Sequence, residues 1–331
     1  MKKITFVLLL TLVLALAACG KKSDGEASAN SADDQVVLLT NADEEAVNTW
    51  KATLDKAGYE GKYMIQSLAT SELGGKLMAE GKTLQADLIT MSTYFLQSAQ
   101  DKNEMFADLV FETTSLDEHP PYYLPILGNT GAIFINKEVI KANKLPNPTS
   151  IKDLTDPVYK GFVSIPNIMD SSTGWLMVQA VIDAYGEEEG HEVLQALIEN
   201  VGPHLESSGS GPIKKVQAGE VAVGFGLRHQ AVIAKETGAP IDFIDPSEGN
   251  FSLTEGIAVV EKESGHHPLA MEMAEVLMKD SREKMLEYYP VALYEGETVD
   301  SIYQPAYSKQ FKEGLTVDLL EKHQEFFNSA K

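Results

Sequence analysis

The feature that most constrains the fold is a repeated alternation of short apolar runs with longer stretches whose apolar residues recur at helical spacing. In the first part of the chain this pattern predicts strands at residues 36–41, 61–66 and 86–91, and helices at 43–57, 71–80 and 92–100. Strands that alternate with helices are typical of a parallel sheet with crossover helices. The sequence therefore predicts an α/β fold.

A second alternating set follows the proline-rich passage at 119–123. It predicts strands at 131–136, 162–165 and 221–225, and helices at 172–185, 187–200 and 213–218. Strands at 241–244 and 255–260 are expected to return the chain to the first set, ahead of helices at 267–279, 281–287 and 316–328. We expect one domain from residues 35–133 and 255–331 and another from 134–254, hinged around a ligand cleft.

The N-terminus carries a pattern typical of exported bacterial lipoproteins. Two lysines precede an apolar stretch of about 15 residues, which is too short for a comfortable membrane span. Cys19, the only cysteine, directly follows Leu16-Ala17-Ala18. We expect a signal peptide at 1–18, lipidation of Cys19 and a solvated tether at 19–34. We therefore expect the protein on the extracellular face of the cell membrane, held by a lipid anchor.

Charge and motifs exclude several classes of function. The formal net charge of −22 disfavours nucleic acid as a partner, because no basic excess is present to neutralise phosphates. The sequence contains no GxSxG, HExxH, P-loop or glycine-rich dinucleotide motif. His266-His267 has no third ligand residue nearby, which favours a solvated surface pair over a metal site. We therefore expect no enzymatic activity, cofactor or metal.

A run of hydroxyl residues stands where a strand ends and a helix begins. Ser171, Ser172, Thr173 and Gly174 follow the strand expected near 163–166 and precede an apolar helix. Free backbone N–H groups at such a helix start, together with the hydroxyls, form an anion site without a cationic side chain. The alternative is an ordinary helix cap.

Similar loops of hydroxyl and amide residues recur after other expected strands. Each loop alone fits capping, but their recurrence in a predicted interdomain cleft favours a polar ligand pocket. The candidate ligand-binding residues from these loops are Thr40, Asn41, Ser67, Thr70, Ser92, Thr93, Asn129, Thr130 and Ser210.

Three ionisable residues are further candidates. Arg228 and His229 follow the strand at 221–225, where the guanidinium of Arg228 would suit a carboxylate or phosphonate, with a surface salt bridge as the alternative. Glu255 precedes the returning strand, where it would pair with an ammonium group of the ligand or act as a structural cap.

Two passages resemble a known family. The sequence Asp153-Leu154-Thr155-Asp156-Pro157-Val158-Tyr159-Lys160-Gly161 and the passage 216–224, which contains Gly219-Glu220, are similar to motifs of extracellular solute-binding proteins in the ferric-iron and 2-aminoethylphosphonate branch. The resemblance covers the chain after the tether. It implies the type II periplasmic-binding-protein fold, a transport role and an ABC permease in the membrane as partner. We expect the protein itself to be a monomer.

One departure from that family bears on the ligand. Ferric-iron members place two adjacent tyrosines after the strand that ends near Phe225, whereas this chain has Gly226-Leu227-Arg228-His229. Losing two phenolates disfavours a hard trivalent cation. The resemblance then implies a small anionic solute, with 2-aminoethylphosphonate as the lead: its phosphonate at Ser171–Gly174 and an acidic residue on its amine.

The sequence also leaves other functions open. Within the same fold the protein would be a ferric-iron or polyamine binder, although a polyamine site would be expected to stack its ligand between several aromatic side chains. In a different class it would be a surface adhesin or a ligand sensor, because closure of a hinged pair serves transport and signalling equally.

Overall fold

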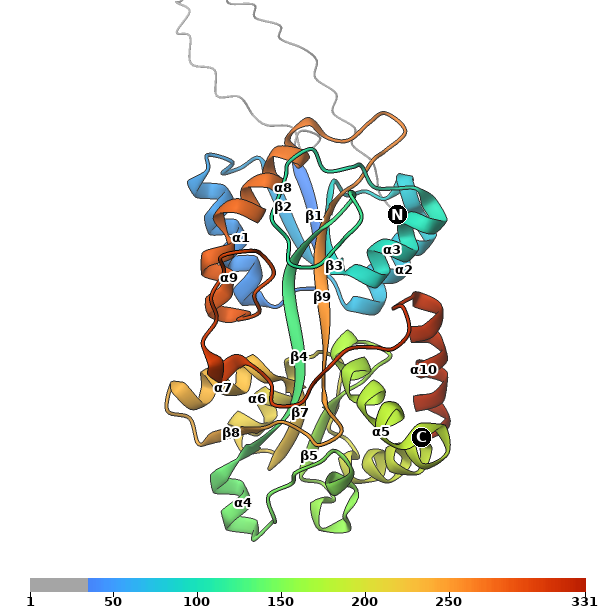
Figure 1. The fold of residues 1–331 in the computed structure, drawn as a ribbon, viewed down its shortest axis with the longest axis vertical. Helices are drawn as coiled ribbons and strands as arrows, with labels where there is room; N and C mark the ends of the chain where they lie inside the picture. Colours follow the sequence, from blue (N-terminus) through green and yellow to red (C-terminus); the bar gives the residue numbers. More distant parts are fainter. Residues whose placement is uncertain (1–34) are drawn as a thin grey trace, which may run out of the picture.

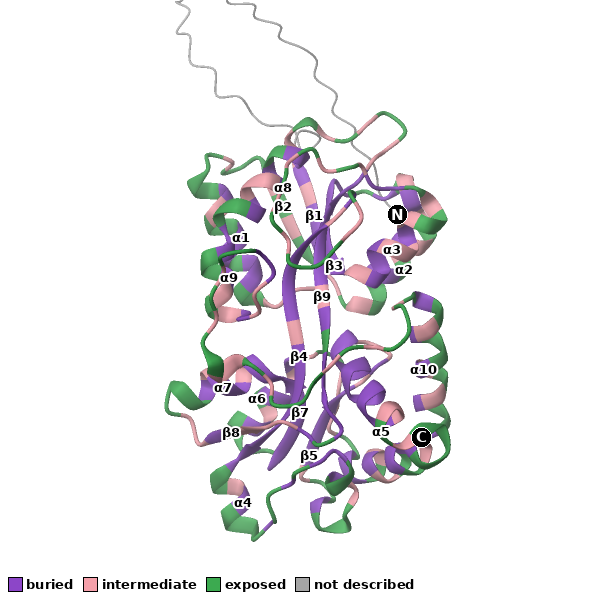
Figure 2. Ribbon diagram, viewed as in Figure 1, coloured by how far each residue is buried: buried purple, intermediate pink, exposed green. Residues whose placement is uncertain are grey.

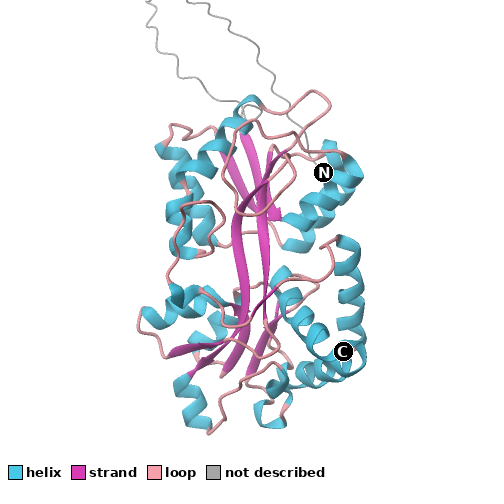
Figure 3. Cartoon of the chain, viewed as in Figure 1, coloured by secondary structure: helices cyan, strands magenta, loops and turns pink. Residues whose placement is uncertain are grey.

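Two long antiparallel strands organise the structure, a computed structural model that describes residues 35–331. β4 (Leu124–Asn136) and β9 (Asn250–Val259) pair from Leu124 opposite Ile257 to Thr130 opposite Ser252. Both strands run through the two lobes of the molecule, and every other strand adds to one end of this pair (Figures 1 and 3). The predicted signal peptide, Cys19 and the tether lie outside the described residues.

The first lobe is a parallel α/β unit joined to the upper ends of the long strands. β1 (Val36–Thr40) pairs in parallel with β2 (Tyr63–Ser67) and with β3 (Leu88–Ser92), and β3 pairs antiparallel with β9. Its helices are α1 (Glu44–Lys56), α2 (Thr70–Glu80), α3 (Thr93–Asn103), α8 (Pro268–Asp280) and α9 (Arg282–Tyr288), with the short 3-10 helix η2 (Gly81–Thr83). Figure 1 shows α1, α8 and α9 on one side of the sheet and α2 and α3 on the other.

The second lobe is built around the lower ends of the same strands. β7 (Val223–Leu227) pairs antiparallel with β4 and in parallel with β5 (Val163–Pro166). The remaining strands are β6 (Leu205–Glu206), β8 (Ile241–Ile244) and β10 (Ser308–Lys309). Its helices are α4 (Lys137–Asn143), α5 (Ser172–Val201), α6 (Gly211–Ala218), α7 (Arg228–Glu236) and α10 (Val317–Ser329), with the 3-10 helices η3 (Lys152–Thr155), η4 (Pro157–Tyr159) and η5 (Ser301–Tyr303).

The central strands are apolar because helices cover the sheet on both faces. β4 is buried at every position except Asn129, and the buried colour continues along it in Figure 2. Strands covered on both faces carry near-continuous apolar runs instead of an alternating pattern. Trp50 of α1 and Trp175 of α5 are fully buried and anchor helices against the sheet in their respective lobes.

The predicted α/β class is confirmed, with several local corrections. The two helices expected at 172–185 and 187–200 form α5, interrupted at Gly186, whose positive φ of 73° breaks the helical geometry. β4 and β9 begin earlier than expected because their polar residues, such as Asn129 and Thr254, still pair within the sheet. The strand at 241–244 does not return to the first lobe, since β8 pairs with Ile133–Asn136.

The boundaries expected at 133/134 and 254/255 fall inside β4 and β9, so the division into domains stays a prediction. The C-terminal helix α10, which was expected in the first domain, packs against α5 of the second lobe. There Trp175 Nε1 donates to His323 Nδ1 at 2.7 Å. Between residues 35 and 331 no helix is both long and apolar enough to cross a membrane.

Candidate functional site

A cavity of about 250 Å³ lies between the two lobes, and we call it the interlobe pocket. It sits where several strands end and the following helices begin, the usual place for ligands in α/β proteins. Its lining residues come from both lobes and from the two long strands: Asn41, Ala42, Asp43, Leu68, Ala69, Thr70, Leu127, Asn129, Asp170, Ser171, Ser172, Thr173, Ser207, Ser208, Gly209, Leu227, Glu255 and Tyr289.

Helix starts surround this pocket. The lining segments 41–43, 68–70, 170–173, 207–209 and Leu227 lead directly into α1, α2, α5, α6 and α7. The first N–H groups of a helix have no partner within it, and the helix dipole adds partial positive charge at that end. None of the residues that line the pocket is Lys, Arg or His. An anion in this pocket would therefore be held by backbone and hydroxyl donors.

The donor wall of the pocket consists of Ser171, Ser172 and Thr173 at the start of α5, with loop 207–209 beside them. Ser171 caps the helix, because its Oγ accepts from the backbone N–H of Thr173 at 3.3 Å. Ser172 and Thr173 also line the pocket, so their hydroxyls are placed to meet a solute. A Cβ at Gly209 would lie 2.2 Å from Thr173 Oγ1, so the loop approaches this closely only as glycine.

The acceptor wall consists of Asn41, Asp43, Asn129 and Glu255. Among the described residues Asn41 Oδ1, Asn129 Oδ1 and Glu255 Oε2 are buried without a hydrogen-bond donor. Buried polar atoms in native proteins nearly always have partners, so three orphaned acceptors in one pocket indicate a missing donor. Burial, reinforced by the negative charge of Asp43, raises the pKa of Glu255 to about 7.

Asp43 stands at the end of the acceptor wall and also reaches the second lobe. Its Oδ1 accepts from Ser210 Oγ at 2.9 Å, and its Oδ2 accepts from Gln230 Nε2 at 3.2 Å. Burial raises the pKa of its carboxyl above the ordinary value. Tyr289 lies beside it, and burial raises the pKa of this phenol well above its usual range. The neutral phenol therefore contributes shape and polarity, not charge.

Seven residues predicted from the sequence line the pocket. They are Asn41, Thr70, Asn129, Ser171, Ser172, Thr173 and Glu255. Thr70 accepts from Asn41 Nδ2 at 3.0 Å and so fixes the orientation of that amide. Glu255 was expected at the start of the returning strand, and it lies further inside, within β9, opposite Ser92 of β3 and Leu127 of β4.

Other predicted residues support the pocket without lining it. Thr40 is fully buried and accepts from Thr90 Oγ1 at 2.6 Å, and Thr130 shares a hydrogen bond of 2.8 Å with Ser252. Gly174 packs its Cα against the backbone of Ile168, where a Cβ would clash. The remaining ones are Ser67, which is exposed at the end of β2, Ser92, which is the N-cap of α3, Thr93, which is the first residue of α3, and Ser210, which donates to Asp43.

Arg228 and His229 do not enter the interlobe pocket as expected. The guanidinium of Arg228 is buried against Asp245, with N–O distances of 2.7 and 3.1 Å, and donates to the Ile302 carbonyl at 2.7 Å. His229 faces a neighbouring cavity and packs on Tyr289 with ring centroids 4.9 Å apart. Burial lowers the pKa of His229 to about 3, so this imidazole is neutral at physiological pH.

Sequence reasoning missed several lining residues. Asp43 and Tyr289 carry no motif, because one directly precedes α1 and the other directly follows the short helix α9. Asp170 also lines the pocket, and its Oδ2 accepts from Asn167 Nδ2 at 2.7 Å. The apolar and small members are Ala42, Leu68, Ala69, Leu127, Ser207, Ser208, Gly209 and Leu227.

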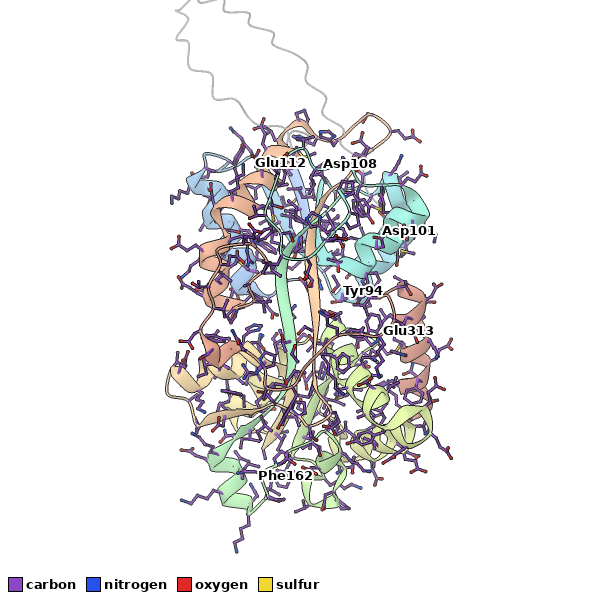
Figure 4. The ribbon with its side chains drawn as sticks, viewed as in Figure 1. Tyr94, Asp101, Asp108, Glu112, Phe162 and Glu313 are labelled. Atoms are coloured by element: carbon purple, nitrogen blue, oxygen red, sulfur yellow. The ribbon has the colours of Figure 1, made fainter. Side chains whose placement is uncertain are left out.

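The pocket does not have the ligands of a metal centre. Within residues 35–331 no group of three or more His, Cys, Asp or Glu side chains is placed to hold a metal ion. Tyr289 is the single tyrosine among the residues that line the pocket. In Figure 4, Tyr94 of α3 lies at the lower end of the first lobe, where its ring packs edge-on against Trp175 of the second lobe at 5.0 Å. Tyr94 is thus part of the packing between the lobes.

Comparisons with known proteins place this geometry in a wider group. A family model described as "Bacterial extracellular solute-binding protein" matches residues 83–311. The chain is 28% identical over 205 residues to the Fe(3+)-binding periplasmic protein of Serratia marcescens, a match that covers 60% of this chain and 58% of the relative. Across the curated relatives, the matches span 33% to 58% of the relative's length.

Solved structures share the fold over nearly their whole length. The periplasmic binding protein P5PA has a TM-score of 0.72 at 17% identity, and the alignment covers 89% of this chain and 98% of that one. The periplasmic binding protein AfuA of Actinobacillus pleuropneumoniae, solved with fructose-6-phosphate bound, has a TM-score of 0.66 at 18% identity, with coverage of 89% and 97%. The two-lobed arrangement is thus that of periplasmic binding proteins.

Proposed function

Because the chain belongs to the bacterial extracellular solute-binding protein family, we propose that it captures a small solute bearing a phosphonate-like anion and an ammonium group. The lead candidate is 2-aminoethylphosphonate. The protein would deliver this solute to an ABC permease, as a monomer held to the outer face of the cell membrane through Cys19. Each of these finer points is a proposal and rests on the sequence pattern and the pocket together.

The observation that carries the proposal is the opposite chemistry of the two walls. The donor wall offers the hydroxyls of Ser172 and Thr173 and the positive end of the α5 dipole, which suit phosphonate oxygens. The acceptor wall holds three buried oxygen atoms without donors, from Asn41, Asn129 and Glu255. An ammonium group carries three N–H donors and a positive charge, so it satisfies such a set of acceptors.

Iron is disfavoured by the same residues. A hard trivalent cation prefers several anionic oxygens arranged around it. The interlobe pocket offers one tyrosine, and its carboxylates form no metal-binding group within the described residues. The hydroxyls of Ser172 and Thr173 would add little to the binding of a metal.

A polyamine is the second candidate, and Asp170 is the observation that favours it. This carboxylate adjoins Ser171 of the donor wall and lines the same pocket as Asp43 and Glu255. A diamine would then find three carboxylates among the lining residues of one pocket. Against it, Tyr289 is the one aromatic side chain among the lining residues, and α5 presents its positive end to the same place.

A thermal-shift screen of the purified chain tests the proposal. A solute present at 100 times its dissociation constant stabilises the folded state by about 2.7 kcal/mol. We expect 2-aminoethylphosphonate to raise the melting temperature, and ferric citrate, putrescine and spermidine to leave it unchanged. A shift with putrescine or spermidine but none with phosphonates would establish the second candidate instead.

Removing the hydroxyls then locates the anion. Replacing Ser172 and Thr173 by Ala is expected to weaken binding by about 1 to 3 kcal/mol for each charge-assisted hydrogen bond lost. The matched control is Thr83→Ala on η2, an exposed threonine away from the pocket. Equal affinities in the double variant and the control would place the anion elsewhere.

A further inference from the structure

The side chain of Asp43 does not cap its helix, although an aspartate at the start of a helix usually does so. It occupies the N-cap position of α1, yet its side chain accepts no hydrogen bond from the first turn of that helix. Asp at this position ordinarily accepts from the N–H of the second or third helical residue. Both carboxylate oxygens are instead turned across the cleft toward the second lobe.

The contacts of Asp43 join one lobe to the other. Ser210 stands at the start of α6, and Gln230 lies in the first turn of α7, so the two donors come from different helices of the second lobe. Asp43 itself belongs to α1 of the first lobe. A rotation of the lobes about β4 and β9 that opens the cleft would separate the carboxylate from both donors.

The same side chain separates two cavities. Beside the interlobe pocket lies a second cavity of about 340 Å³, with Ile213, Ile233 and Tyr288 among its lining residues. Asp43 and Tyr289 line both cavities. The hydrogen bonds of Asp43 to Ser210 and Gln230 therefore close the interlobe pocket on the side of α6 and α7.

The charge around Asp43 links this closure to the solute. The negative charge of Glu45 opposes ionisation of Asp43, and the positive charge of Lys214 partly offsets this effect. The negative charge of Asp43 in turn opposes ionisation of Glu255. Bringing a buried carboxylate against a second one is unfavourable unless one of them is protonated or a cation lies between them. A solute ammonium group at the acceptor wall supplies that cation in the closed arrangement.

We infer that Asp43 is a latch across the cleft, whose hydrogen bonds to Ser210 and Gln230 close the lobes and whose charge selects a solute that carries an ammonium group. The selection of an ammonium group rests on the proposed function, whereas the latch itself does not. Two variants separate the roles. Asp43→Asn keeps a side chain that can bridge to Ser210 and Gln230 but removes the charge, and Ser210→Ala with Gln230→Leu removes the bridge but keeps the charge.

Distances between spin labels test the latch without any solute. Labels on Lys51→Cys in α1 and Lys235→Cys in α7, in a full chain carrying Cys19→Ser, report the separation of the lobes because no other thiol is present. We expect a short-distance population in the otherwise unchanged chain and in Asp43→Asn, and its loss in the Ser210→Ala, Gln230→Leu variant. The matched control is Gln217→Leu, which alters the second cavity without touching Asp43. An unchanged distance distribution in the double variant would overturn the latch.

Titration calorimetry with 2-aminoethylphosphonate and ethylphosphonate, which lacks the amine, tests the selection. We expect the unchanged chain to bind 2-aminoethylphosphonate at least tenfold more tightly than ethylphosphonate. Asp43→Asn is expected to lose most of that preference. The Ser210→Ala, Gln230→Leu variant is expected to bind both probes about tenfold more weakly and to retain the preference. Preference unchanged in Asp43→Asn would overturn the selective role. If neither probe binds any variant, the proposed function fails, while the label distances still decide whether the latch exists.

Discussion

The two walls of the interlobe pocket differ in how they acquire their polarity. The donor wall is local, because Ser171, Ser172 and Thr173 form the start of one helix and lie at the positive end of its dipole. The acceptor wall is assembled from distant segments, since Asn41, Asn129 and Glu255 come from three different strands or strand ends. A solute that satisfies both must carry an anion and a cation a short distance apart. Only the acceptor wall is expected to respond to pH near neutrality, because the pKa of Glu255 is raised to about 7.

The largest effect on binding is expected from reversing the chemistry of the donor wall. Thr173→Asp would place a carboxylate where we propose the anion lies. Two like charges about 4 Å apart repel by about 4 kcal/mol at the effective dielectric of a protein surface. The affinity for 2-aminoethylphosphonate, measured by titration calorimetry, is therefore expected to fall about 1,000-fold.

The matched control for this change is Thr83→Asp, which adds the same charge at an exposed position on η2. Its affinity should equal that of the unchanged chain. If Thr173→Asp instead strengthens the binding of putrescine, the donor wall accepts a cation and the contrast between the walls disappears.

The next largest effect is a dependence of stability on pH that comes from Glu255. Its pKa is about 7 in the folded protein against the ordinary 4.5, so the folded state holds this proton more tightly than the unfolded state. The stabilising contribution is complete below about pH 4.5 and is lost as the pH rises through about 7. A shift of this size corresponds to about 3 kcal/mol.

Denaturant unfolding at pH 5 and pH 8, without solute, measures this contribution. The unchanged chain should lose more stability between these two values than Glu255→Gln, whose amide does not titrate. Other groups that titrate in both proteins cancel in the difference. Equal losses in the two proteins would show that Glu255 is not protonated preferentially in the folded state.

Of the two walls, the donor wall was the one that could be predicted from the sequence. Ser171–Thr173 follow an apolar run and precede another, so a helix start with free N–H groups could be read from neighbouring residues alone. The acceptor wall required knowledge of the sheet. Glu255 was identified as a candidate for pairing with an ammonium, but its position opposite Ser92 and Leu127 depends on strand pairings that no local pattern specifies.

The expectations that the structure does not follow share one physical origin, because each depends on contacts between residues that are distant in sequence. Arg228 was expected in the cleft because it follows a strand, yet Asp245, 17 residues later, engages its guanidinium. The role of Asp43 depends on Ser210 and Gln230, which are far away in sequence. The placement of α10 on α5 through Trp175 and His323 is a long-range packing choice. Periodicity fixes which face of a helix is apolar but not which lobe will cover it.

A smaller effect concerns how the preference for an amine varies with pH. Above pH 7 Glu255 is ionised and attracts an ammonium group, whereas at lower pH its neutral form attracts it less. We expect the unchanged chain to prefer 2-aminoethylphosphonate over ethylphosphonate about tenfold more strongly at pH 8 than at pH 6, a difference of about 1.4 kcal/mol. Because both probes carry the phosphonate, its own titration largely cancels in the ratio of their affinities. A ratio that does not change with pH, or that changes equally in Glu255→Gln, would remove Glu255 from the acceptor wall as a charge.

The smallest effect on binding is expected at Arg228, which belongs to neither wall. Its guanidinium already donates to Asp245 and to the Ile302 carbonyl. Its Cζ also lies over the Phe243 ring, 4.5 Å from the ring centre. Lysine cannot reproduce the paired hydrogen bonds of the guanidinium, so Arg228→Lys should lower the melting temperature. The affinity for 2-aminoethylphosphonate should nevertheless change less than about twofold, or about 0.4 kcal/mol. A tenfold loss of affinity in a protein that remains folded would mean that Arg228 leaves Asp245 to bind the anion, and the donor wall would then include a cationic side chain after all.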